Sequence, residues 1–192
     1  ISNILVIKQL KKDYDEKWFG SLSYTFGETT DINSFGASTT RTAFRNLPVN
    51  GNTNAPGIFA SDFDLRHKIL LYLGKSFKLF GFGKTSLSTV LEASQQGRFS
   101  YTYASNGDIN NDGVPSNDLI YIPVDANDIE LESYNSMGTT ISVEEQWEAL
   151  DRFISQSDYL NANRGKIAER NGSINPWFVQ ANLKLVQNIS FA

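Results

Sequence analysis

One short segment combines carboxylate and amide side chains at the spacing of a calcium-binding loop. Asp108, Asn110 and Asp112 alternate along the chain and a glycine follows, as in the first half of an EF-hand loop. The second half differs, because the twelfth position is Leu119 and an acid, Asp118, comes one place early. Asp and Asn are also common turn residues. Two interpretations remain open: a Ca²⁺ site made by Asp108, Asn110, Asp112 and Asp118, and a turn rich in Asp and Asn that binds no ligand.

The other reactive side chains give little indication of catalysis. The sequence has no cysteine, which excludes a thiol nucleophile, a disulfide and a thiolate metal site. His67 is the only histidine and lies in an alternating segment between Arg66 and Lys68, where we expect a lipid-facing, interfacial or packed position. No GxSxG, HExxH or P-loop motif occurs. We therefore expect that the protein is not an enzyme.

Charge is distributed unevenly along the chain. Eleven Asp and Glu residues, and no Lys or Arg, lie between Arg98 and Arg152. Three basic residues follow, Arg164, Lys166 and Arg170, and we expect them to pair with this acidic segment. Exposed pairs contribute less than about 1 kcal/mol each, so their role would be organising rather than strongly stabilising. The net charge of −4 argues against nucleic acid as a partner.

The composition excludes a helical membrane protein but permits a membrane β-barrel. Hydrophobic residues make up 40% of the chain, its mean hydropathy is −0.31, and no apolar run approaches eighteen residues. In a barrel every second residue of a strand faces the lumen and can be polar. The aromatic content of 12% is high for a soluble domain and suits aromatic belts at the two membrane interfaces.

The segment 175–191 has the clearest strand pattern in the sequence. Polar residues alternate there with an apolar set made of Trp177, Val179, Ala181, Leu183, Leu185, Ile189 and Phe191. Successive side chains of a strand point to opposite faces, so this pattern gives one apolar and one polar face. Soluble strands usually have about five or six residues, whereas this alternation continues for about fifteen. The segment predicts a transmembrane β-strand, and a strand of a soluble sheet is the alternative.

Four more strands are predicted, at residues 4–12, 18–28, 62–75 and 84–92. In the third of these, Arg66 and Lys68 are predicted on the face opposite His67. The connections alternate between short segments, 13–17 and 76–83, and long ones, about 29–61 and 104–175. Outer-membrane barrels have short periplasmic turns and long extracellular loops, so both long segments are expected outside the cell.

The second long loop contains a predicted helix. Ser142 and Glu145 form a capping box, and Trp147, Leu150 and Phe153 follow at helical spacing. Together these segments predict an all-β fold: an antiparallel transmembrane β-barrel section of about five long strands, with long extracellular loops, one of which carries a short helix. Because a membrane barrel needs at least about eight strands, we expect the chain to be part of a larger barrel.

Several segments resemble the C-terminal barrel region of TonB-dependent outer-membrane receptors, with the Oar-like receptors of Bacteroidetes, relatives of SusC-like importers, as the nearest branch. The resemblance spans essentially all 192 residues. Its most specific part includes the run Asn-Arg-Gly-Lys-Ile-Ala-Glu-Arg-Asn-Gly. The segments that carry it are 61–67, 117–123, 151–154, 163–172 and 175–177.

The resemblance implies a 22-stranded barrel with an N-terminal plug, energised through the periplasmic protein TonB. Neither a plug nor a TonB box is recognised within residues 1–192, and no signal peptide opens the chain, so we expect it to be an interior piece of such a receptor. The implied partners are outer-membrane lipid, the rest of the barrel and plug, TonB through the N-terminal part, and a surface lipoprotein or other outer-membrane subunits. The family has no catalytic residues to carry over.

Three functions follow as hypotheses from these observations. The first is part of a TonB-dependent transporter that takes up a bulky ligand across the cell outer membrane, with the long loops forming a ligand vestibule. The second is a structural or docking component of an outer-membrane surface or secretion complex that transports no nutrient. The third is a soluble domain that binds its target with the help of Ca²⁺, which would fold in water without detergent.

Overall fold

The computed structural model describes residues 2–12, 18–78, 83–104 and 107–189. Strands make up 47% of the chain, helices are few and the sheets are antiparallel, which confirms the predicted all-β class. The chain forms two compact units. The first contains Ile1–Asp31, Ala60–Arg98 and Ile174–Ala192, and the second contains Ile32–Phe59 and Phe99–Ser173. Among the described residues, no helix has the length and apolar character needed to span a membrane.

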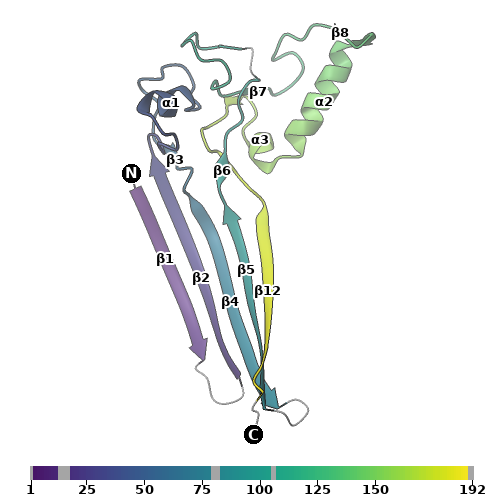
Figure 1. Ribbon diagram of the computed structural model, residues 1–192. Helices are drawn as coiled ribbons and strands as arrows, with labels where there is room; N and C mark the ends of the chain where they lie inside the picture. The colour runs from purple at the N-terminus through teal and green to yellow at the C-terminus, as the bar shows by residue number, and fades with distance from the viewer. Residues whose placement is uncertain (1, 13–17, 79–82, 105–106, 190–192) are drawn as a thin grey trace. The chain divides into compact units, whose positions relative to one another are not determined.

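The first unit is built around a long antiparallel sheet. Its strands lie in the order β1-β2-β4-β5-β12, and the short β3 (Phe59–Ala60) pairs with β2 outside this path (Figure 1). The five long strands are β1 (Ser2–Lys12), β2 (Trp18–Asp31), β4 (Leu65–Lys78), β5 (Lys84–Gln96) and β12 (Trp177–Gln187). Each has eleven to fourteen residues, at least twice the usual length of a strand.

The structure has all five predicted long strands but changes their ends. β2 and β5 run three and four residues further than expected, and β4 begins at Leu65 instead of residue 62. β12 ends at Gln187, where the alternation of the sequence also breaks, so Ile189 lies beyond the strand. The predicted turn at 13–17 and the predicted strand residue Phe191 lie outside the described residues. Of the predicted connection 76–83, residues 76–78 belong to β4 and 79–82 are outside the described residues.

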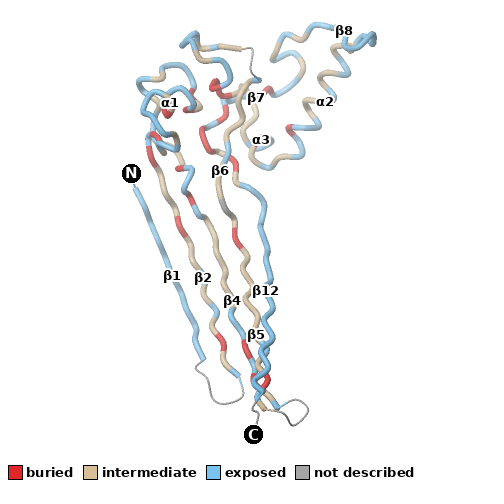
Figure 2. Tube along the Cα trace, viewed as in Figure 1, coloured by how far each residue is buried: buried red, intermediate tan, exposed pale blue. Residues whose placement is uncertain are grey.

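One face of this sheet is mainly apolar over all five strands, and the polar residues in its middle rows are Lys8, Lys12 and Thr89. The pairing aligns Leu10 with Leu22, Leu22 with Leu71, Leu71 with Leu91, and Leu91 with Ala181. The same register defines what we call the apolar face: Val6, Leu10, Leu22, Tyr24, Phe26, Ile69, Leu71, Leu73, Leu91, Ala93, Val179, Ala181, Leu183 and Leu185. Its outer strands are exposed, with Leu10 at 73% and Leu183 at 77% of full exposure (Figure 2).

Aromatic residues lie at both ends of the apolar face. At one end, His67 accepts or donates a hydrogen bond with the Tyr24 hydroxyl at 2.9 Å, and its ring stacks on Trp177 at 6.0 Å. Phe26 contacts the same ring at 5.4 Å. At the other end, the Lys12 ammonium lies 4.6 Å from the centre of the Trp18 ring. His67 is therefore packed among aromatic side chains, one of the positions expected from the sequence.

The opposite face, which we call the polar face, is rich in hydroxyl and charged groups. Ser21, Ser23 and Thr25 lie on it, and Lys68 forms a 2.8 Å salt bridge with Glu92. It also carries apolar residues, for example Phe19, whose ring packs 5.1 Å from that of Tyr72. The two faces therefore differ strongly, although the polar face is mixed in character.

Arg66 departs from the predicted alternation. The register between β4 and β5 shifts between Leu65 and His67, so Arg66 occupies a β-bulge. The extra residue turns its guanidinium toward the apolar face, where it lies 5.6 Å from the Phe26 ring centre and 3.2 Å from the Glu28 carboxylate. The prediction that Arg66 shares a face with Lys68 was therefore wrong, because simple alternation cannot anticipate a bulge.

A buried ion pair fixes the chain next to this bulge. Asp64 has a fully buried carboxylate that accepts from the Thr29 amide at 2.8 Å and from Arg98 Nε at 2.5 Å. Arg66 Nε lies 3.6 Å from the same carboxylate. Since buried charges are tolerated only when they are paired and hydrogen-bonded, this group ties β2 and Arg98, which follows β5, to the residue that precedes β4.

The second unit contains the helices and the short strands. Its helices are α1 (Thr40–Arg45), α2 (Val143–Ser155) and α3 (Asp158–Ala162). The short strands pair as β7 (Tyr121–Ile122) with β10 (Lys166–Ile167), β8 (Tyr134–Ser136) with β9 (Thr139–Ile141), and β6 (Arg98–Phe99) with β11 (Ser173–Ile174). The core is a cluster of Ile122, Ile154, Leu160 and Ala168.

The predicted helix in this unit is α2, and its predicted capping box is present. Ser142 Oγ accepts from the Glu145 amide at 3.2 Å, and the Glu145 carboxylate accepts from the Ser142 amide at 2.9 Å. The expected pairing of basic residues with the acidic segment is found at Arg164, which binds Asp151 at 2.7 Å. Arg170 instead donates to the Ile32 carbonyl and lies over the Phe59 ring.

Candidate functional site

The calcium-like segment forms a tight loop closed by its own side chains. The Asp108 carboxylate accepts from the amides of Asp112 at 3.0 Å and Gly113 at 2.9 Å. Asn110 Oδ1 also accepts from the Asp112 amide, at 2.9 Å. Asp112 Oδ1 accepts from the Val114 amide at 2.8 Å. These are Asx-turn hydrogen bonds, in which short polar side chains satisfy the backbone of a turn.

The fourth predicted ligand lies in the same loop but points its carboxylate at the backbone. Asp118 is buried, and its Oδ2 accepts from the Ile109 amide at 2.8 Å. Among the described residues, no three or more acidic, histidine or cysteine side chains are grouped so that they could hold a metal ion. The loop links Asp108, Asn110 and Asp112 through these bonds, whereas Asp118 bonds to Ile109, and Ca²⁺ binding there stays a prediction.

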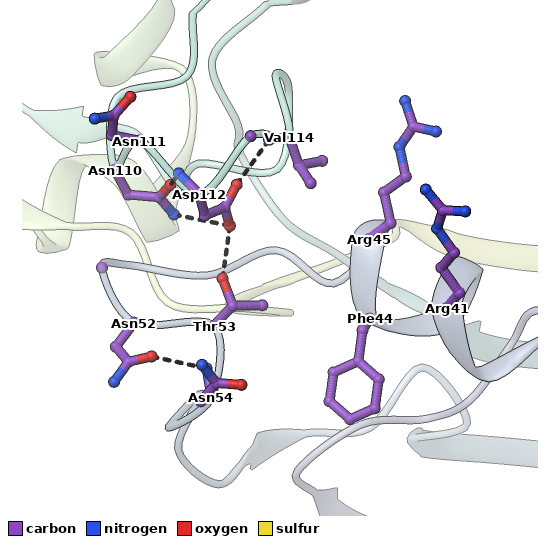
Figure 3. A pocket seen from close by; sticks show the side chains of 12 residues that line it. Arg41, Phe44, Arg45, Asn52, Thr53, Asn54, Asn110, Asn111, Asp112 and Val114 are labelled. Carbon is purple, nitrogen blue, oxygen red and sulfur yellow. Dashed lines mark hydrogen bonds between the residues drawn. The ribbon is translucent and has the colours of Figure 1, made fainter.

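A polar hollow of about 940 Å³ lies beside this loop in the second unit. Three segments form its walls: α1, residues 51–54 and residues 110–114. The side chains that line it are Arg41, Phe44, Arg45, Asn52, Thr53, Asn54, Asn110, Asn111, Asp112 and Val114 (Figure 3). Its size is within the range of small-molecule sites, and its lining is mainly amide, hydroxyl and guanidinium groups.

Hydrogen bonds join the walls of the hollow to one another. Thr53 Oγ1 donates to Asp112 Oδ2 at 2.6 Å, which connects two walls that are far apart in the sequence (Figure 3). Beneath them, the Val49 amide donates to the Asn117 carbonyl at 2.9 Å, and the Leu119 amide donates to the Val49 carbonyl at 3.0 Å. Val49, Leu47 and Leu119 are all buried. These backbone bonds join the segment between α1 and residues 51–54 to the segment that follows residues 110–114.

The carboxylate of Asp112 is already occupied by donors. Partial burial would raise its pKa, but hydrogen bonds from Thr53, Asn117, the Val114 amide and Asn110 outweigh that effect and lower the pKa of Asp112 below its usual value. The group is thus a stable anion at neutral pH. Its bonds serve to hold the walls together, and this leaves the two arginines as the charged groups available to a ligand.

Arg41 and Arg45 are four residues apart on α1, so they lie on the same side of the helix. Figure 3 shows the two side chains extending side by side. Neither guanidinium has a hydrogen-bond or ion-pair partner among the residues that the structure describes. Like charges at this spacing destabilise a helix by a few tenths of a kcal/mol, and the position of Arg45 in the last turn of α1 offsets this through the helix dipole.

Only weak signals in the sequence point to the hollow. The run Thr-Arg-Thr-Ala-Phe-Arg has arginines at helical spacing, and Thr39 caps the helix through the Thr42 amide, but this pattern is common on surfaces. The contact between Thr53 and Asp112 joins residues 59 positions apart, and no local pattern predicts it.

Comparison of the chain with known protein families, with curated proteins and with solved structures finds no match.

Proposed function

We propose that this chain is part of a TonB-dependent outer-membrane transporter, in which the long sheet crosses the membrane and the second unit lies on the extracellular side. The observation that carries the proposal is the apolar face, a largely hydrophobic surface that covers five strands, is interrupted by Lys8 and Thr89, and remains exposed in Leu10, Leu183 and Leu185. Soluble proteins rarely expose an apolar area of this extent, whereas a membrane sheet must.

The height of the apolar face fits the hydrocarbon layer. The apolar face extends along β4 from the residues paired with His67 to those paired with Lys75. These two positions are eight residues apart, which at about 3.3 Å per residue is roughly 26 Å. With the strand tilt of about 40° usual in barrels, this corresponds to roughly 20 Å along the membrane normal, near the apolar band of about 25 Å. Tyr24 and Trp177 at one end and Trp18 at the other are suited to the two interfaces.

The edges of the sheet support a larger assembly. β1 and β12 each pair with one neighbour in the described sheet, and both are exposed along their whole length (Figure 2). Unpaired backbone groups are very costly in hydrocarbon, so a sheet that lies in a membrane must continue with further strands. In a transporter these would be the other strands of the same barrel, and the polar face would line its lumen.

The transport activity rests on the resemblance of five sequence segments to TonB-dependent receptors, described above. In this proposal the second unit forms part of the vestibule that receives a ligand before TonB-driven uptake. The docking alternative places the same sheet in the same membrane, so membrane location does not distinguish the two.

The test compares cells that lack the gene for the protein containing this chain with cells that lack TonB. Growth is measured in a panel of media, each limited in one nutrient. A transporter predicts at least one medium in which both deletions cause the same growth defect and in which the double deletion is no worse. If the protein lies in the outer membrane and its loss causes no defect in any medium where TonB is needed, the transport proposal is wrong and docking replaces it.

A further inference from the structure

The hollow beside α1 is the strongest candidate for a ligand site in the described residues. Of its charged side chains, Asp112 already accepts hydrogen bonds from four donors. Arg41 and Arg45 have no partner among the described residues, so both can bind a ligand. A guanidinium presents paired N–H donors that match the two oxygens of a carboxylate. Two of them on one side of a helix therefore favour a ligand with two acidic groups.

The other walls of the hollow indicate which further groups such a ligand carries. The amide side chains of Asn54 and Asn111 line the hollow, and neither has a hydrogen-bond partner among the described residues. The side-chain Oδ1 of Asn52 accepts from the Asn54 backbone amide at 2.9 Å, which leaves the side-chain Nδ2 of Asn52 as a donor. Each free amide can both donate and accept, as a hydroxyl group does. The lining therefore suits a polyhydroxylated ligand better than a hydrocarbon chain.

We propose that this hollow binds a small polyhydroxylated dicarboxylate, or a larger molecule that carries such a unit, with its carboxylates on Arg41 and Arg45 and its hydroxyl groups on the asparagine amides. The inference deepens the proposed function, on which its biological meaning rests, because it assigns a class of ligand to the vestibule. The binding itself is a property of the second unit and is measurable without transport.

The test uses the full-length protein in detergent and three ligands of equal chain length. Galactarate has two carboxylates and four hydroxyl groups, adipate has the carboxylates without the hydroxyl groups, and galactitol has the hydroxyl groups without the carboxylates. Binding is measured by calorimetry, with saturation-transfer NMR for weak ligands. Galactarate is expected to bind most tightly, adipate at least about tenfold more weakly and galactitol not measurably. Higher salt should weaken galactarate binding, since the site is partly exposed.

Substitutions then locate the binding. In R41Q/R45Q the affinity for galactarate should fall by roughly tenfold for each guanidinium, or below detection. The matched control is Arg152→Gln, which removes an arginine from the exposed surface of α2 outside the hollow and should leave the affinity unchanged. In N54A/N111A the affinity for galactarate should fall while that for adipate stays the same. Circular dichroism of each variant checks folding, which exposed substitutions should preserve.

The inference is overturned if galactarate does not bind the wild-type protein, or if it binds R41Q/R45Q as well as the wild type. Equal binding of adipate and galactarate also overturns it, because the hydroxyl groups would then have no role. These results leave the transport proposal standing if the growth defects of the receptor and TonB deletions still coincide. Conversely, galactarate binding without any such growth defect supports this site and removes the transport role.

Discussion

Replacing Leu71 by arginine gives the sharpest energetic test of the membrane face. Leu71 lies in the middle row of the apolar face, paired with Leu22 on one side and Leu91 on the other. It is four residues from His67 and four from Lys75, so each end of the apolar band is roughly 13 Å away along the strand. If the sheet crosses a membrane as proposed, no residue of the described sheet is therefore further from both interfaces.

The expected cost follows from that depth. An arginine at the bilayer midplane of a membrane barrel costs about 2–4 kcal/mol, falling to about 0–1 kcal/mol near the interfaces. L71R should therefore lower the folding equilibrium constant by a factor of roughly 30 to 700. The matched control is Leu70→Arg, the same substitution one residue earlier and on the polar face, opposite Ser23 and Glu92. There we expect a change of less than about 1 kcal/mol, because the lumen is wet and the carboxylate is close.

The assay is reversible urea unfolding of the full-length protein in lipid vesicles, followed by tryptophan fluorescence and by electrophoretic mobility. The quantity compared is the free energy of unfolding of L71R and of L70R. Their difference cancels the general effect of adding a charge. If the two variants unfold at the same urea concentration, the apolar face does not meet lipid. A sheet with water on both faces would show that result, because Leu70 and Leu71 are both half-buried and the two substitutions would then have similar costs.

Three further predictions concern the contacts outside the apolar face. Asp64→Asn should destabilise the protein by about 3–5 kcal/mol in chemical denaturation, because it removes the carboxylate that neutralises the buried Arg98 guanidinium. The control is Asp62→Asn at the exposed neighbouring position, which should cost less than about 0.5 kcal/mol. Ser142→Ala should lower the free energy of unfolding by about 1 kcal/mol, because it removes the cap of α2. Amide exchange should become faster in the first turn of α2 and stay unchanged in α3. An equal increase of exchange in both helices would contradict the assigned cap. Because the pKa of Asp112 is lowered on folding, its contribution is complete above the unfolded value of about 3.9 and is lost as the pH falls through the lower folded value, so exchange at Val114, whose amide donates to Asp112, should accelerate only in that acid range; acceleration already at pH 6 would refute the assigned bond.

The parts of the fold that the sequence predicts are those with a regular pattern over many residues. The five strands follow from alternation over eleven to fourteen residues, and the capping box of Ser142 and Glu145 marks the start of α2. Arg66 was misplaced because a bulge changes the parity of a strand without any local signal in its residue types. α1 and α3 were missed because helices of five or six residues contain too few turns to show periodicity.

The candidate site was less predictable than the fold. The residues of the calcium-like loop were found from their spacing, and their hydrogen bonds are those of a self-closed turn, so the pattern alone could not separate the two interpretations. The hollow depends on Thr53 meeting Asp112 and on the bridge between Val49 and Asp118. Such contacts are set by the path of long loops, which residue propensities do not determine.

Single cysteines placed along β4 test the central claim most directly, since this chain has no cysteine of its own. Ile69, Leu71 and Leu73 lie on the apolar face, and Leu70 and Tyr72 lie on the polar face. Each is replaced in turn by cysteine in the full-length protein, reconstituted in vesicles, and labelled with an environment-sensitive fluorophore whose quenching by brominated lipid is recorded. The account predicts strong quenching at 69, 71 and 73 and weak quenching at 70 and 72. Equal quenching at all five positions, or none at any of them, would contradict a sheet with one face in lipid and one in water.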